Sequence, residues 1–310
     1  MVSGPVASRT RRLGRGGWLS AGIGVLCAAA VLLATLGAQA KAPVAALPAA
    51  GHPAILSINP CTDAILAEVA DPAQIRALSA YSSDPAQSSM PVAVARRFPA
   101  TGGTVEEIVA AHPDVVVAGG FMAPATRAAL ARLGIPVVAF GVTHTLGESI
   151  AQVRALARLA GQPGRGEVLV ARMTAAVAGL DGVARREHAH PAALVWQSGG
   201  MVAGPDALVV DLLRHAGFAD YAAARGLSQA QILGLEPLLA DPPDVLLVAG
   251  NANANEDRLL RHPALAALTA TRQVAFDPAL EWCGGPTVIR AAARIAAIRH
   301  DMAATPGRGA

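Results

Sequence analysis

The sequence predicts an α/β protein of two Rossmann-like lobes that are joined by a long connector helix, with a ligand cleft between the lobes. Three observations support this. Short β-branched runs alternate with segments of helical period, a pattern typical of parallel strands covered by helices. The alternation stops for one long stretch without proline and then restarts. Because 53% of the residues are hydrophobic and 15% are charged, the chain can bury a core of this kind.

The first 40 residues differ in composition from the rest and are predicted to be a signal peptide. A cluster of arginines precedes an apolar run from Trp18 to Leu36, and Ala38-Gln39-Ala40 fits the small-residue pattern of a cleavage site. We expect cleavage near Ala40 and a periplasmic mature protein. A retained membrane anchor stays open as an alternative, because the apolar run approaches the roughly 20 residues of a spanning helix. The general secretory and twin-arginine export routes also both stay open.

The N-terminal lobe is expected at residues 54–145. Its apolar runs end at turns rich in proline, asparagine and glycine, and the run after Pro113-Asp114 is continuous, as in a strand buried on both faces. The expected elements are strands at 54–58, 115–118 and 137–140, and helices at 62–69 and 125–133.

Connecting helices are expected at 146–190, and a C-terminal lobe at 191–303. The connector contains one helix at 146–159 and a second at 165–187, which would be roughly 35 Å long at ~1.5 Å per residue. The segments around Asp114 and Asp244 echo each other, which indicates two similar lobes. The remaining expected elements are strands at 192–196, 245–249 and 273–276, and helices at 208–215 and 287–302.

The net charge and the cysteines indicate which partners and which covalent links are expected. The net charge of +3 falls once the signal arginines are removed, and no basic stripe follows, so nucleic acid is not expected as a partner. Cys27 lies in the apolar signal run, which leaves Cys61 and Cys283. An even pair in an oxidising compartment permits a disulfide.

Several motifs, in this order and spacing, resemble the iron-chelate and vitamin B12 family of periplasmic binding proteins, which serve ABC importers. The resemblance covers nearly the whole mature chain. The motifs are Ser57-Ile58-Asn59-Pro60-Cys61-Thr62-Asp63, Tyr81-Ser82-Ser83-Asp84-Pro85, Gly103-Thr104-Val105-Glu106-Glu107-Ile108, Leu133-Gly134-Ile135-Pro136-Val137-Val138 and Glu281-Trp282-Cys283-Gly284-Gly285-Pro286.

This resemblance implies a solute-binding protein that captures a metal chelate and delivers it to an inner-membrane permease with its ATPase. The chelate would be a corrinoid, a ferric siderophore or heme. The protein would act as a monomer, perform no bond chemistry, and hold no cofactor or metal of its own. Two other functions stay open, a secreted redox or metal-dependent enzyme that uses Cys61 and Cys283, and a ligand-sensing lobe for a membrane partner.

The expected cleft residues lie mostly on loops that follow strands, where aromatic side chains are more often functional than structural. The stretches 99–103 and 118–121 carry few aromatic residues, which weighs against vitamin B12 itself. The expected cleft residues are Cys61, Tyr81, Phe121, Trp196, Gln197, Met201, Trp282 and Cys283.

The two cysteines fall on loops that the family places at the cleft, one on each lobe. A disulfide between them would lock the lobes against opening and would stabilise the fold by roughly 5 kcal/mol from loop-closure entropy. Two free thiols that bind a soft metal, and two buried inert cysteines, are the other interpretations.

The resemblance also implies permease docking through one glutamate on each lobe. The matching positions are Glu106 and Glu236. Exposed carboxylates on both lobes would fix the orientation of the complex and speed the encounter. The alternative is that each is a solvated glutamate in the first turn of a helix, where the helix dipole favours it.

Overall fold

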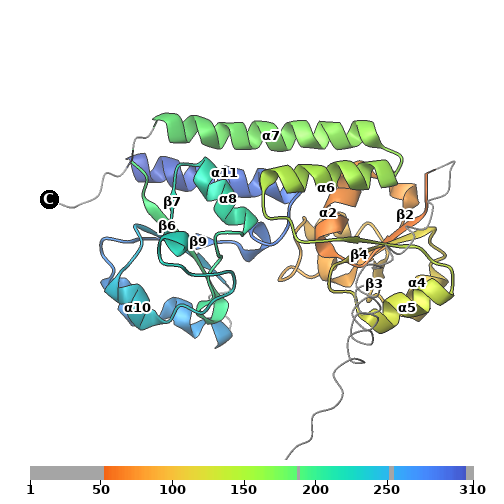
Figure 1. Ribbon diagram of the computed structural model, residues 1–310, viewed down its shortest axis with the longest axis horizontal. Helices are drawn as coiled ribbons and strands as arrows, with labels where there is room; N and C mark the ends of the chain where they lie inside the picture. Colours follow the sequence, from red (N-terminus) through yellow and green to blue (C-terminus); the bar gives the residue numbers. More distant parts are fainter. Residues whose placement is uncertain (1–51, 187–188, 251–254, 305–310) are drawn as a thin grey trace, which may run out of the picture. The chain divides into compact units, whose positions relative to one another are not determined.

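Two parallel sheets organise the computed structural model, which describes residues 52–186, 189–250 and 255–304 (Figure 1). One sheet has five strands in the order β3-β2-β1-β4-β5, and the other has four in the order β7-β6-β8-β9. All their pairings are parallel. The prediction of two α/β lobes is confirmed.

The first sheet forms the N-terminal lobe. Its strands are β1 (Ile55–Ser57), β2 (Ile75–Ser79), β3 (Ala100–Thr101), β4 (Val115–Gly119) and β5 (Val137–Phe140). Its helices are α2 (Pro60–Val69), α3 (Val92–Ala95), α4 (Val105–Ala110) and α5 (Pro124–Arg132), with the short 3-10 helices η1 (Pro72–Gln74) and η2 (Ala80–Ser83). Sequence reasoning found β1, β4 and β5 but missed β2 and β3, because Arg76 interrupts the apolar run of β2 and β3 is only two residues long.

The second sheet forms the C-terminal lobe. Its strands are β6 (Ala192–Gln197), β7 (Ala219–Asp220), β8 (Val245–Ala249) and β9 (Arg272–Phe276). Its helices are α8 (Leu208–His215), α9 (Tyr221–Ala224) and α10 (Leu235–Ala240), with the 3-10 helices η3 (Ser198–Gly200), η4 (Asn255–Arg261), η5 (Pro263–Ala267) and η6 (Pro278–Leu280).

Three long helices link the lobes, namely α6 (Leu146–Leu159), α7 (Pro163–Arg186) and α11 (Pro286–Ala304). The 24 residues of α7 make a rod of about 36 Å. It packs on α2 and α6 toward one lobe and on α8 and α11 toward the other (Figure 1). Gly166 lets α6 and α7 approach closely, because a Cβ there would lie 2.5 Å from that of Ala157.

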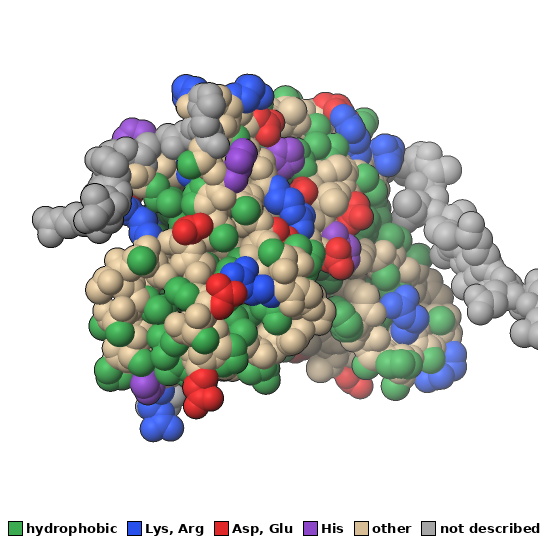
Figure 2. All heavy atoms as spheres, turned by 60° about the vertical axis from the view of Figure 1, so that its left-hand side comes forward, with side chains coloured by type: hydrophobic (Ala, Val, Ile, Leu, Met, Phe, Trp, Pro, Cys, Tyr) green, Lys and Arg blue, Asp and Glu red, His purple; other side chains and the backbone are tan. Residues whose placement is uncertain are grey.

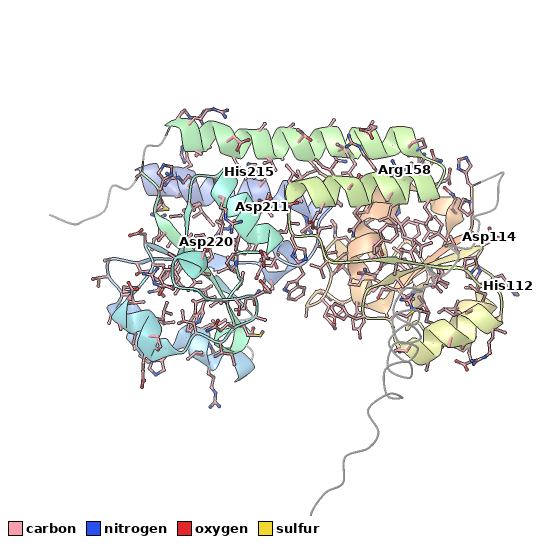
Figure 3. All side chains as sticks on the ribbon, in the orientation of Figure 1. His112, Asp114, Arg158, Asp211, His215 and Asp220 are labelled. Atoms are coloured by element: carbon pink, nitrogen blue, oxygen red, sulfur yellow. A yellow bond between two sulfur atoms is a disulfide. The ribbon has the colours of Figure 1, made fainter. Side chains whose placement is uncertain are left out.

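A repeated aspartate explains the echo between the two halves of the sequence. Asp114 precedes β4 and accepts a hydrogen bond of 2.7 Å from the amide of Ala54, at the start of the neighbouring strand. Asp244 precedes β8 and accepts an equivalent bond of 2.7 Å from the amide of Ala192. Figure 3 labels Asp114 at the edge of its lobe. Each lobe therefore ties its central strand pair together in the same way.

One continuous apolar core runs from the N-terminal lobe, under the connecting helices, into the C-terminal lobe. It includes Ile65 on α2, Val153 on α6, Met173 on α7 and Ile295 on α11, all fully buried. Two smaller clusters cover the outer sheet faces, one around Val116 and one around Trp196. The described residues all belong to one compact unit that spans 45–310.

The predicted signal peptide at 1–40 lies outside the described residues. None of the described helices has the length and apolar character to cross a membrane. On the face seen in Figure 2, acidic and basic side chains of both signs are interspersed among apolar and uncharged ones.

Candidate functional site

A cavity of about 640 Å³ opens at the carboxyl ends of β1, β4 and β5. In a parallel sheet, ligands commonly bind where the strand order reverses, and here that point lies between β1 and β4. Asn59 follows β1, Gly119 is the last residue of β4, and both line the cavity. A Cβ at Gly119 would lie 3.2 Å from the amide nitrogen of Asn59, so the small residue keeps this end of the cavity open.

Aromatic rings from four separate segments line the cavity. Tyr81 lies on η2, Phe121 follows β4, Phe140 ends β5, and Trp282 comes from the loop between β9 and α11. Phe121 is 93% exposed, Tyr81 56% and Trp282 49%. Large exposed rings gathered around one cavity mark a ligand site.

The polar lining of the cavity is carboxamide and hydroxyl, without charge. The lining residues are Ile58, Asn59, Pro60, Cys61, Tyr81, Gln87, Gly119, Gly120, Phe121, Met122, Phe140, Gly141, Val142, Thr143, Gln152, Trp282 and Gly284. None of these described residues is an aspartate, glutamate, lysine, arginine or histidine.

Internal hydrogen bonds decide which atom each amide side chain can offer a ligand. Asn59 uses its Oδ1 to cap α2 at the amide of Cys61, which leaves its Nδ2 as a donor. Gln87 donates through Nε2 to Asp84, and Gln152 donates through Nε2 to the carbonyl of Gly141. Their Oε1 atoms remain as acceptors. The cavity therefore suits a ligand with both N–H donors and oxygen acceptors on its periphery.

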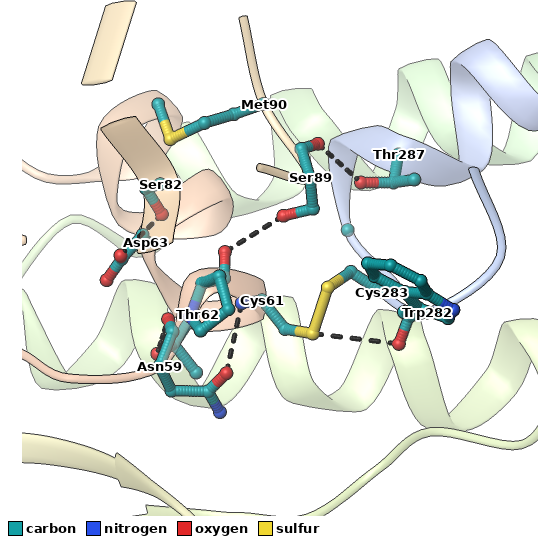
Figure 4. The surroundings of a disulfide bond; sticks show 12 residues. Asn59, Cys61, Thr62, Asp63, Ser82, Ser89, Met90, Trp282, Cys283 and Thr287 are labelled. Atoms are coloured by element: carbon teal, nitrogen blue, oxygen red, sulfur yellow. Dashed lines mark hydrogen bonds between the residues drawn. A yellow bond between two sulfur atoms is a disulfide. The ribbon is translucent and has the colours of Figure 1, made fainter. Parts of the chain in front are cut away.

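Cys61 and Cys283 are joined by a disulfide at the edge of the cavity (Figure 4). The bond connects the start of α2 in the N-terminal lobe to the loop before α11, and the two Cα atoms lie 4.9 Å apart. The Sγ of Cys61 also contacts the carbonyl oxygen of Trp282 at 3.6 Å. Of the three interpretations of these cysteines, the structure shows the disulfide.

The structure places the eight predicted cleft residues in different surroundings. Cys61, Tyr81, Phe121 and Trp282 line the cavity. Cys283 is buried behind it, with 4% of its surface exposed. The four residues that line the cavity come from α2, from η2 and from two separate loops.

The prediction that Trp196 lines the cleft is wrong. Its side chain is fully buried in the outer core of the C-terminal lobe, and its Nε1 donates to the carbonyl of Leu233 at 3.1 Å. Position 196 lies within β6, one residue before the strand ends, so its side chain points into the sheet's covering layer. Gln197 donates to Glu281, and Met201 pairs with Ile232 at 38% exposure; neither lines this cavity.

Sequence reasoning missed several lining residues. Asn59 lies two residues after the end of β1, and its place between a strand and Pro60 was the signal that could have identified it as both cap and site residue. Phe140 ends β5 and Gln152 lies on α6. Gln152 could not be found from sequence, because its approach to the cavity depends on how α6 packs.

Two buried carboxyl groups flank the disulfide. Asp63 on α2 is fully buried, and burial raises its pKa to about 7 although Ser82 and the amide of Ser79 donate hydrogen bonds to it. Glu281 is 7% exposed, and burial raises its pKa to about 7 against the hydrogen bond from Gln197. Each carboxyl has one buried oxygen without a hydrogen-bond partner among the described residues.

These pKa values predict that the protein loses stability as pH rises from about 4 to about 7. In that window the folded protein retains protons that the unfolded chain, with carboxyl pKa values near 4, has released. Each group contributes a loss of about 3 to 4 kcal/mol, complete above pH 7 and absent below pH 4. Asp63→Asn removes the contribution of this carboxyl group, so the free energy of unfolding in urea should depend less on pH in the variant than in the native protein. Asp301→Asn, at an exposed site, is the control, and equal pH dependence for Asp63→Asn and the native protein would refute the account.

Glu106 and Glu236 occupy equivalent places on the two lobes. Each lies exposed in the first turn of a short helix, α4 and α10 respectively. Both helices lie at the side of their lobe away from α7 (Figure 1). Glu107, next to Glu106, completes the capping box with Thr104, so Glu106 is not used as a cap. Neither Glu106 nor Glu236 forms an ion pair with another described residue.

Comparison with known proteins identifies the class. A family model described as "Periplasmic binding protein" matches residues 55–276, which span both sheets. The chain therefore belongs to the periplasmic binding protein family, whose members are binding proteins rather than enzymes, and the resemblance drawn from the motifs is confirmed. No curated protein sequence matches the chain.

Solved structures of low sequence identity share the fold. The heme-binding protein RhuT of Roseiflexus sp. RS-1 has 22% identity and a TM-score of 0.64, and covers 82% of this chain and 100% of its own. The heme-binding protein HutB of Vibrio cholerae has 18% identity and a TM-score of 0.66, with coverage of 80% and 99%. The vitamin B12 binding protein BtuF of Vibrio cholerae has 16% identity and a TM-score of 0.63, with coverage of 82% and 99%.

Proposed function

We propose that the protein is the periplasmic solute-binding component of an ABC importer, which captures a metal chelate and delivers it to the inner-membrane permease and its ATPase. It works as a monomer and carries no cofactor of its own. The observation that supports this most strongly is the cavity at the strand ends, open to solvent and lined by four aromatic rings from both lobes. Proteins of the same fold are described as binding heme and vitamin B12.

The lining favours a chelate without net charge. An anionic catecholate complex, or the two carboxylates of heme, would find no cation among the described lining residues to balance their charge. A corrinoid carries carboxamides on its periphery, which match the acceptors of Gln87 and Gln152 and the donor of Asn59. Together with Phe121 from the 118–121 stretch, Tyr81, Phe140 and Trp282 supply apolar contact that the 99–103 and 118–121 stretches alone do not suggest. A corrinoid or a ferric hydroxamate is therefore the favoured ligand.

An enzyme that used Cys61 and Cys283 as free thiols is disfavoured, because a disulfide sulfur is neither a nucleophile nor a thiolate ligand. A sensor that presents its ligand state to a membrane partner would use the same cavity. Uptake measurements separate the sensor from the importer component, because only the latter is needed for transport.

Calorimetric titration of the mature protein against a panel of four compounds tests the proposal. The panel is cyanocobalamin, a neutral ferric hydroxamate, heme and an anionic ferric catecholate. We expect 1:1 binding of a neutral chelate with a Kd of about 1 μM or tighter, and weaker binding of the anionic complexes. The metal-free hydroxamate is the matched control. Absence of binding to all four compounds would overturn the proposal.

A further inference from the structure

Several links cross between the two lobes beside the cavity. The first is the disulfide between Cys61 and Cys283. The second involves Ser89, whose hydroxyl donates to the carbonyl of Pro60 at 2.9 Å and whose own carbonyl accepts from the Thr287 hydroxyl at 3.1 Å (Figure 4). The same carbonyl also accepts from Arg290. These links join α2 and the loop before α3, both in the N-terminal lobe, to the start of α11.

A third link holds the loop that carries Trp282. The amide of Gly285 donates to the hydroxyl of Ser149 on α6 at 2.8 Å. A Cβ at Gly284 would lie 2.3 Å from that hydroxyl, and one at Gly285 would lie 2.4 Å from the side chain of Ile65. The loop 281–286 is therefore wedged against α2 and α6 with no room for a side chain at either glycine.

A hydrogen bond between α6 and α8 also joins the lobes. Asp211 on α8 accepts a hydrogen bond of 2.9 Å from the amide of Leu146, at the start of α6 (Figure 3). The continuous core under α7 joins the same elements. Core packing and these hydrogen bonds hold the lobes together, whereas the disulfide lies at the edge of the cavity, next in sequence to Trp282.

We propose that the Cys61–Cys283 disulfide is a positioning element, which fixes Trp282 in the wall of the cavity so that the ligand cavity exists before the ligand arrives. The choice of ligand rests on the proposed function, whereas the tethering of Trp282 rests only on the contacts described above. A hinged receptor must order its two walls at the moment of binding, and that ordering lowers the affinity. With Trp282 tethered through the next residue in the chain, this ordering is already complete in the free protein.

The test is the double variant Cys61→Ser/Cys283→Ser, which leaves no unpaired thiol, compared with the native protein. Hydrogen exchange of the Gly285 amide should become at least about tenfold faster in the variant, because its bond to Ser149 opens more often. The Kd for cyanocobalamin should rise about tenfold, mainly through faster dissociation. Leu265→Ala, in the separate core cluster of the C-terminal lobe, is a control that lowers stability without touching the loop.

The outcomes separate the two proposals. If the native protein binds no cyanocobalamin, the Gly285 exchange rate still tests the positioning role. If the double variant does not fold, the native protein treated with a phosphine reductant is measured in the same two assays. A folded variant, or a reduced native protein, with unchanged Gly285 exchange and unchanged Kd would overturn the positioning role. A raised Kd in Leu265→Ala of the same size would assign the effect to general stability and would overturn it as well.

Discussion

Reversing both exposed glutamates, Glu106→Arg together with Glu236→Arg, is expected to lower chelate uptake at least tenfold while the Kd for the ligand stays unchanged. Each carboxylate is exposed in the first turn of its helix, does not line the cavity, and forms no ion pair with a described residue. Opposite charges across an interface speed the encounter and fix its orientation, and like charges oppose it at a cost of several kcal/mol. If the permease docks on both carboxylates, as the family resemblance implies, the double reversal opposes docking at both lobes at once.

The measurement is uptake of radiolabelled cyanocobalamin by cells that hold the importer but lack the native binding protein. Glu106→Gln with Glu236→Gln removes charge without reversing it and should give a smaller loss. Asp301→Arg, on α11, is the control for a change in surface charge and should leave uptake intact. Undiminished uptake with the double reversal would show that these glutamates do not dock the permease.

Replacing Trp282 with alanine is expected to weaken ligand binding by about 10- to 100-fold. About half of this side chain is exposed in the free protein, so a bound ligand can bury roughly 100 Å² more of it. At about 25 cal/mol per Å² this contact contributes on the order of 2.5 kcal/mol to binding. Titration calorimetry of the variant with cyanocobalamin measures the loss.

Two further variants make the result specific. Trp282→Phe keeps an aromatic face and should lose no more than about fivefold in affinity. Trp196→Phe changes the buried ring of the C-terminal lobe and should leave the Kd unchanged, provided the variant is folded. Equal affinities of the Trp282→Ala variant and the native protein would exclude Trp282 from the ligand contact.

The sequence predicted those parts of the fold that depend on local pattern. Continuous apolar runs located β4, β5 and β8, and absence of proline located α7. The strands β2 and β3 were not predicted, because they are only five and two residues long and such short segments carry little periodicity. Their presence follows from pairing with a neighbour, which no local pattern encodes.

The site was predictable where its residues follow strands or stand in distinctive motifs, as Tyr81, Phe121 and Trp282 do. The prediction for Trp196 failed because β6 runs one residue further than expected, to Gln197, so that position 196 lies inside the strand and its side chain points into the core. Strand ends are the boundaries that sequence patterns locate least well. Gln87 and Gln152 entered the cavity through tertiary packing. The raised pKa values of Asp63 and Glu281 likewise depend on burial, which sequence reasoning did not assign to either residue.

A crystal structure of the mature protein with cyanocobalamin would show whether this cavity is the chelate site. We expect one ligand between Tyr81 and Trp282, in contact with Phe121 and Phe140, with its carboxamides facing Asn59, Gln87 or Gln152 and the disulfide intact. A ligand bound elsewhere on the surface, or an empty cavity at saturating ligand, would contradict the assignment of this cavity as the chelate site.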